Sequence, residues 1–129
     1  MKSTNAYTVD SQVARVPAEV RPIVEAARAT VRAAAPGAVE IAYQGEPPSN
    51  PSTMWKLARY TVDGESRVGI GTFRRHSALF FQRGAEFDDG TGLLQGGGKA
   101  SRFVPLRTPE DAERPEVRRL VERAVAAAR

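Results

Sequence analysis

The stretch Thr53–Gln82, TMWKLARYTVDGESRVGIGTFRRHSALFFQ, decides the fold of this chain because it holds three strand patterns joined by short turns. The strand patterns are Thr53–Val62, Arg67–Phe73 and His76–Gln82. Asp63-Gly64 is a typical two-residue hairpin turn, and Arg74-Arg75 is a second tight connection. Strands that are joined by turns this short are antiparallel, so the sequence predicts an antiparallel meander.

The side-chain pattern of these strands makes further predictions. The apolar face of the first strand switches near Leu57, which predicts a β-bulge there. Gly69 and Gly71 share one face of the second strand, which lets a helix or a ligand approach the backbone closely, and helix packing is the commoner reason for such a pair. The aromatic side chains expected in the core are Trp55, Tyr60, Phe80 and Phe103.

Two further strand patterns and two helical patterns flank this stretch. Val39–Tyr43 and Ala100–Leu106 are strand-like. Pro17–Ala35 and the segment from Thr108 to the C-terminus carry apolar residues at helical spacing. Pro22 leaves two interpretations open: the regular helix begins near Arg21, or it bends at the proline. The order predicts an α+β two-layer sandwich, with a sheet of about five strands covered on one face by an N-terminal and a C-terminal helix.

Length and composition set the broad class. A chain of 129 residues predicts a single domain, which we assign to residues 13–129 after a loose polar segment, residues 1–12. The absence of Cys excludes disulfides, thiol catalysis and thiolate metal sites. The chain shows no signal-peptide pattern and no membrane-span pattern, so we expect a cytoplasmic protein that does not bind a membrane.

Several local motifs follow one another in a recognisable order. They are Ala33-Ala34-Ala35-Pro36-Gly37, Glu40-Ile41-Ala42-Tyr43-Gln44-Gly45, Phe73–Phe81 (FRRHSALFF) and Gly92–Lys99 (GLLQGGGK). From about Pro17 to Val125 the chain resembles the YdhG-like family, known as domain of unknown function 1801. The resemblance implies a compact α+β domain in a frataxin-like arrangement, with no assigned activity. The chain departs from the family at Glu46-Pro47-Pro48, where members often carry a Gly-Met-Pro-Thr-like turn.

A candidate anion site lies in the glycine-rich stretch. Gly96, Gly97 and Gly98 precede Lys99, and Arg102 follows on the next strand. Mobile backbone N–H groups beside two cations can hold an anion, and His76 adds a titratable donor. The ligand-binding residues we predict are Gly96, Gly97, Gly98, Lys99, Arg102 and His76. The alternative is a purely structural loop, since the phosphate-loop motif fails at Leu93 and Ala100.

The sequence gives less support to two other classes of function, metal binding and catalysis. By analogy with frataxin, Glu86, Asp88 and Asp89 would hold iron or another divalent metal, but no ligand spacing enforces such a site. No nucleophile, base and orienting group occur as a set, so we do not expect an enzyme and name no catalytic residue and no cofactor.

The charge pattern bears on partners. The net charge is +4, but acidic residues accompany most of the basic ones, which is typical of solvated faces and argues against a nucleic-acid partner. Binding of single-stranded nucleic acid would also need exposed aromatic side chains beside arginine, and we expect Phe103 to be buried. The function we predict is therefore a small binding domain for a small anion or a protein partner, and a homodimer is left open.

Overall fold

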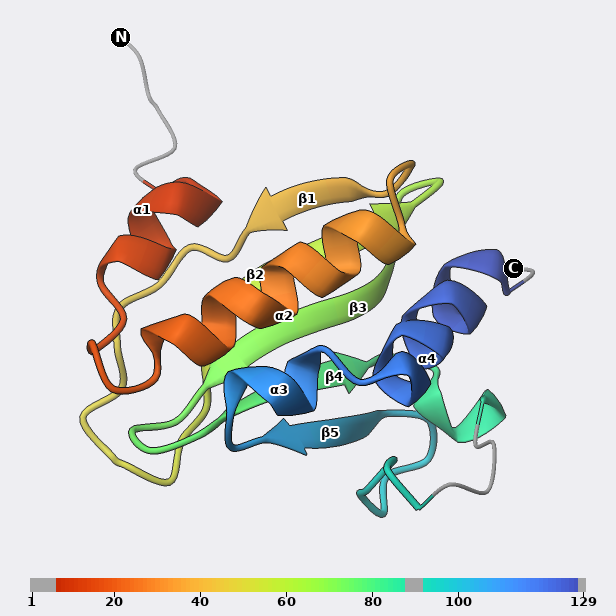
Figure 1. The fold of residues 1–129 in the computed structure, drawn as a ribbon. Helices are drawn as coiled ribbons and strands as arrows, with labels where there is room; N and C mark the ends of the chain where they lie inside the picture. The colour runs from red at the N-terminus through yellow and green to blue at the C-terminus, as the bar shows by residue number, and fades with distance from the viewer. Residues whose placement is uncertain (1–6, 88–91, 128–129) are drawn as a thin grey trace, which may run out of the picture.

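Five strands form one sheet in the order in which they occur in the chain (Figure 1). A computed structural model describes residues 7–87 and 92–127. The strands are β1 (Val39–Ala42), β2 (Trp55–Val62), β3 (Glu65–Thr72), β4 (Ser77–Phe81) and β5 (Arg102–Leu106). Every neighbouring pair is antiparallel, which confirms the predicted meander. Asp63 and Gly64 both have positive φ, at 52° and 80°, as a tight hairpin turn requires.

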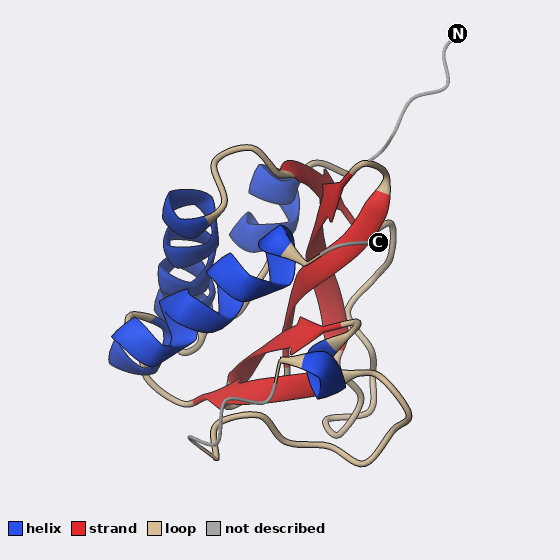
Figure 2. Ribbon diagram, turned by 90° about the vertical axis from the view of Figure 1, so that its right-hand side faces the viewer, coloured by secondary structure: helices blue, strands red, loops and turns tan. Residues whose placement is uncertain are grey.

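The helices lie on one face of this sheet (Figure 2). They are α1 (Val9–Ala14), α2 (Arg21–Ala34), α3 (Pro109–Ala112) and α4 (Pro115–Ala126), and a short 3₁₀ turn, η1 (Gly84–Glu86), follows β4. The predicted two-layer α+β arrangement is therefore confirmed. None of the helices in the described residues is long and apolar enough to cross a membrane.

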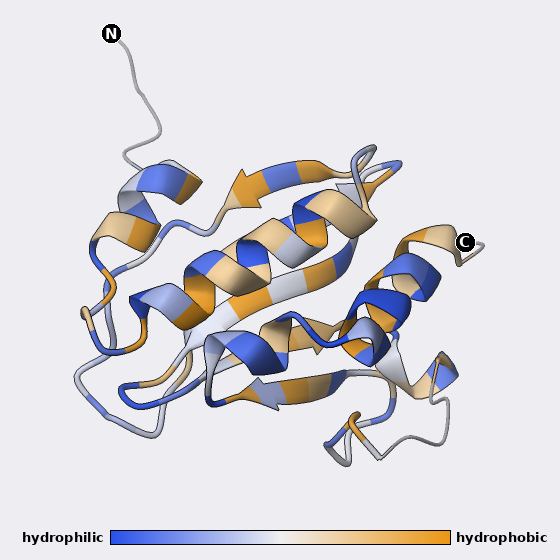
Figure 3. Cartoon of the chain, viewed as in Figure 1, coloured by the Kyte–Doolittle hydropathy of each residue, from blue (hydrophilic) through white to orange (hydrophobic). Residues whose placement is uncertain are grey.

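The two long helices each bury one apolar stripe. Ile23, Val24, Ala27 and Val31 of α2 are buried, and hydrophobic and hydrophilic residues alternate along α2 and α4 in Figure 3. Helix α2 begins at Arg21 with Pro22 in its first turn, where the missing N–H group costs nothing. The first of the two interpretations of Pro22 is thus correct.

Strand β2 carries the predicted bulge, and its partner β3 carries a second bulge that was not predicted. The pairing with β3 shifts by one residue at Leu57, and it shifts again between Tyr60 and Thr61. The second shift leaves Arg67 of β3 without a partner on β2. Its side chain is only 2% exposed and reaches the end of α4.

The N-terminal segment is more ordered than the sequence suggests. Thr8 and Ser11 form a capping box at the start of α1, and Gln12 is fully buried. The Gln12 side-chain amide donates hydrogen bonds to the backbone oxygens of Tyr43 (3.0 Å) and Gly45 (3.1 Å). The prediction of a loose segment through Gln12 is therefore wrong for residues 8–12, whereas residues 1–6 lie outside the described residues.

Within residues 7–87 and 92–127, no helix lies on the second face of the sheet, contrary to the helix packing expected at the two β3 glycines. A Cβ atom at Gly69 would lie 2.1 Å from the Phe80 ring, and one at Gly71 would lie 2.5 Å from the Met54 sulfur. Side chains rather than a helix therefore cover both glycines. Phe80 is half-buried and Phe103 is 38% exposed, so only two of the four predicted core aromatics, Trp55 and Tyr60, are in the core.

Candidate functional site

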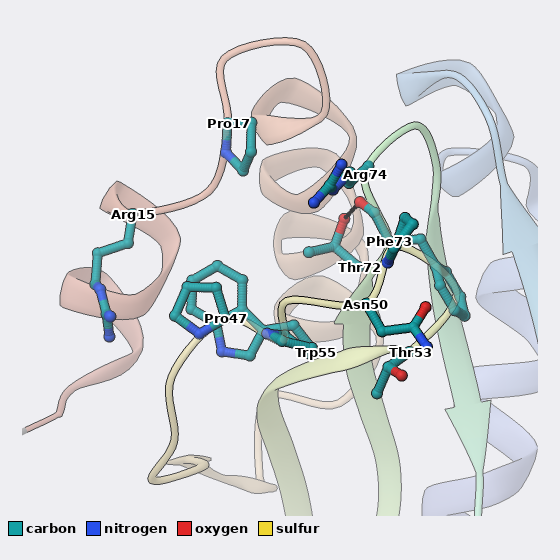
Figure 4. Close-up of a pocket in the computed structure, with 11 residues that line it drawn as sticks. Arg15, Pro17, Pro47, Asn50, Thr53, Trp55, Thr72, Phe73 and Arg74 are labelled. Carbon is teal, nitrogen blue, oxygen red and sulfur yellow. Dashed lines mark hydrogen bonds between the residues drawn. The ribbon is translucent and has the colours of Figure 1, made fainter.

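A cleft opens at the end of the sheet where β2 begins and β3 ends (Figure 4). The α1–α2 connection, the proline-rich loop before β2 and the β3–β4 turn meet there. The cleft has a volume of about 270 Å³. Its lining residues are Arg15, Pro17, Pro47, Pro48, Asn50, Pro51, Thr53, Trp55, Thr72, Phe73 and Arg74. It therefore combines a mainly apolar lining with a few polar groups, as small-molecule sites do.

The sheet itself positions two of the lining residues. Trp55 pairs with Thr72 across β2 and β3, and both residues are buried. The Thr72 hydroxyl lies 2.9 Å from the Ser77 hydroxyl and 2.9 Å from the Phe73 carbonyl oxygen. These hydrogen bonds fix the Thr72 side chain beside the indole, so this part of the cleft is built on regular structure.

The proline-rich loop supplies one wall of the cleft. Pro47, Pro48 and Pro51 have fixed φ angles, which restrict the loop before any ligand binds. Between them, the Asn50 side-chain oxygen accepts hydrogen bonds from the Ser52 backbone N–H (2.9 Å) and hydroxyl (2.7 Å). This local turn contributes to the order of the loop through contacts within its own segment.

Two arginines border the cleft, and their charges are not equally available. The Arg15 guanidinium is 5.5 Å from the Trp55 ring centroid, but it pairs with Glu46 and donates to Gln12. Arg74, in the β3–β4 turn, is exposed and makes one long hydrogen bond, 3.3 Å, to the Ser49 carbonyl oxygen. It has no ion pair within the described part of the chain, so its charge is free to meet an anion.

The glycine-rich loop is closed by its own hydrogen bonds. Gln95 and Phe103 exchange two backbone hydrogen bonds of 2.8 and 2.9 Å across its base. The Arg102 guanidinium donates to the carbonyl oxygens of Gly98 (2.6 Å) and Ser101 (2.8 Å) inside the loop. Gly96 has a φ of +119°, which glycine tolerates. These contacts favour the structural interpretation, although Gly97, Gly98 and Lys99 are exposed.

His76 lies far from that loop. Arg102 pairs with Phe81 at one end of β4, whereas His76 precedes Ser77 at the other end. Five residues of strand separate the two positions, a distance of about 17 Å. The His76 ring stacks on Phe73 at 4.6 Å, and burial, with a smaller contribution from Arg107, holds its pKa below its usual value. The six predicted binding residues therefore do not form one site.

The acidic group predicted for a metal is also not assembled in the described residues. Glu86 accepts hydrogen bonds from Arg83 at 2.8 and 3.0 Å, and these lower the pKa of its carboxyl group. Asp88 and Asp89 lie outside the described residues. Over residues 7–87 and 92–127, no three His, Asp or Glu side chains are close enough together to hold a metal ion.

Comparisons with models of protein families, with curated proteins and with solved structures found no match to this chain. The resemblance to the YdhG-like family stays a prediction. The cleft beside Trp55 was missed at the sequence level because its residues come from three separate segments. The one local signal was the density of prolines before β2.

Proposed function

We propose that this chain is a binding domain for a small organic anion, and that the ligand occupies the cleft lined by Trp55, Thr72 and Arg74. The observation that carries the proposal is the position of Arg74, an exposed arginine without a described ion pair, at the rim of an apolar and aromatic cleft. The function is the one expected from the sequence, but the site lies at the opposite end of the sheet from the glycine-rich loop.

The lining indicates the class of ligand. Trp55, Phe73 and the prolines offer flat apolar surface to a ring, and a guanidinium binds carboxylate or phosphate oxygens through two parallel hydrogen bonds. A cleft of about 270 Å³ is at the small end of ligand sites, so it suits a ligand of about one ring. An aromatic carboxylate such as benzoate combines these two features.

Trp55 allows a direct test because it is the only tryptophan in the chain. Benzoate should change the Trp55 fluorescence in a saturable way and should raise the midpoint of thermal unfolding, since binding to the native state stabilises it. Neutral benzamide, which has the same ring, should bind at least about tenfold more weakly, because a hydrogen bond to a charged group contributes about 1.5–3 kcal/mol.

The matched variants are Arg74→Gln and Arg75→Gln. Both remove one exposed arginine from the same turn, but only Arg74 lines the cleft. Arg74→Gln should weaken benzoate binding about tenfold, and Arg75→Gln should leave it within about twofold. Equal benzoate affinity in the wild type and in Arg74→Gln would exclude the proposed site.

A further inference from the structure

The helix-free face of the sheet presents aromatic and basic side chains together. Register places one cross-strand row, Ile41, Arg59, Gly69, Phe80 and Phe103, on this face, and a second row, Lys56, Gly71, Ala78 and Pro105, beside it. None of these positions is Asp or Glu. The face is therefore positively charged and partly apolar, unlike the helical surfaces, where acidic and basic residues mix.

Gly69 leaves room for one of the aromatic rings of this face. The Phe80 ring fills the space above Gly69 and lies 6.4 Å from the Tyr43 ring, between centroids, at an angle of 44°. Phe103 follows Phe80 across β4 and β5 and is one of the two large hydrophobic side chains exposed in the described residues. An exposed phenylalanine on a regular strand offers a flat surface on which a base can stack.

The cations of this face lie among those rings. The Lys56 ammonium is 5.7 Å from the Tyr43 centroid and 5.7 Å from the Phe80 centroid, and the Arg59 guanidinium is 5.9 Å from the Tyr43 centroid. Neither residue has an ion pair within the described residues. A hollow of about 370 Å³ between Lys56, Phe80 and Phe103 adds depth to the surface.

We propose that this face binds single-stranded nucleic acid, with bases stacked on Phe103 and Phe80 and phosphates beside Lys56 and Arg59. Aromatic rings interleaved with cations on an open sheet recognise single strands, because the unpaired bases stack while the backbone follows the positive charge. The net charge of +4 also favours binding of the negatively charged phosphate backbone. The expected burial of Phe103, which argued against this partner at the sequence level, does not hold.

This site is separate from the benzoate cleft, although Phe73 borders both hollows. The test is fluorescence anisotropy with labelled oligo-U and oligo-dT of about 12 nucleotides, at several salt concentrations. Phe103→Ala should weaken binding at least about fivefold, since one stacked base contributes about 1 kcal/mol or more. Lys56→Ala should also reduce the slope of log affinity against log salt by about 0.7. A preference between the two oligomers would report whether RNA or DNA is bound.

The matched control for charge is Arg119→Ala, an exposed arginine of α4 on the helical side, which should change the affinity less than about twofold. The corresponding duplex should bind more weakly than the single strand, because its bases are not available for stacking. Unchanged affinity in Phe103→Ala, with folding verified by circular dichroism, would overturn the proposal. So would equal binding of the duplex, or tighter binding of poly-glutamate, which would indicate an acidic protein partner.

Discussion

The Phe80 ring lies so close to Gly69 that a Cβ atom added at residue 69 would be 2.1 Å from its Cζ atom. Gly69→Ala must therefore displace the ring, and we expect it to lower the free energy of unfolding by about 1–3 kcal/mol, the usual cost of overpacking. Urea denaturation measures this change. Gly37→Ala is the control, since nothing lies within 4 Å of a Cβ atom there.

A double-mutant cycle identifies the ring as the cause. Adding Phe80→Ala removes the atoms with which the new methyl group would collide, so Gly69→Ala should cost less in that background than in the wild type. The same destabilisation in both backgrounds would mean that the strand needs glycine for another reason. The measurement also tests whether glycine positions the ring on the helix-free face.

Much of the sheet could be predicted from the sequence, because local signals fix it. The Asp63-Gly64 turn sets the first hairpin, and the switch of apolar face at Leu57 marks a real bulge. Helix α1 could not be predicted, since its six residues are too few to show a helical period and Gln12 is held by Tyr43 and Gly45, more than 30 residues away. The exposure of Phe103 was missed because a strand that is apolar on both faces does not show which face the helices cover.

Glu40 joins β1, β2 and α2 in one polar cluster. It accepts hydrogen bonds from Arg28 (2.9 and 3.0 Å) and from the Tyr60 hydroxyl (2.7 Å). Glu40→Gln keeps the size of the side chain but removes the charge that Arg28 faces, and we expect a loss of about 1–3 kcal/mol at pH 7. Thermal or urea denaturation measures it. Glu110→Gln, on an exposed position of α3, should change stability by less than about 0.5 kcal/mol.

The same carboxyl group predicts a dependence of stability on pH. Burial alone would raise the pKa of Glu40, but the hydrogen bonds from Arg28 and Tyr60 outweigh it and hold the pKa below 4.5. The unfolded chain then binds the proton first, so this stabilisation is complete above pH 4.5 and is lost as pH falls through the folded-state pKa. Glu40→Gln should therefore lose less stability than the wild type between pH 5 and pH 3, roughly the range of that titration. If the stability of the wild type and of Glu40→Gln fell equally between pH 5 and pH 3, roughly the range of that titration, this assignment would be contradicted.

His76 gives a second titration, which NMR can follow without ambiguity because it is the only histidine. Burial against Phe73 and the nearby Arg107 should hold its pKa below 6.5 in the folded protein. Stability should then fall as pH drops from 6.5 toward the folded-state pKa, since the unfolded chain gains the proton first. Phe73→Ala exposes the ring and should move the pKa back toward 6.5. A pKa at or above 6.5 in the wild type would show that the ring is not desolvated.

The candidate site was the least predictable part of the molecule. The sequence correctly indicated that Arg74 belongs to a tight connection and that Trp55 is a core residue. They line a cleft only because the proline-rich loop packs beside them, and such a tertiary contact leaves no periodic pattern in the sequence. Conversely, Lys99 and Arg102 are neighbours in sequence, but Arg102 is occupied by the carbonyl groups of its own loop.

Arg67 ties the central strand β3 to the end of α4, and its loss should be the most costly of these substitutions. Its guanidinium donates to the carbonyl oxygens of Ala124 (2.9 Å) and Ala127 (2.7 Å), and its Nε atom lies 2.8 Å from Glu65 Oε1. Arg67→Met fills the same space but leaves two carbonyl groups without their donor, so we expect a loss of about 3 kcal/mol. Arg123→Met, on the exposed side of α4, should cost less than about 0.5 kcal/mol. Hydrogen exchange should show where the structure is weakened. If Arg67 holds the end of α4, the amides of the last turn of α4 should lose protection first. A uniform loss of protection would instead indicate global destabilisation alone.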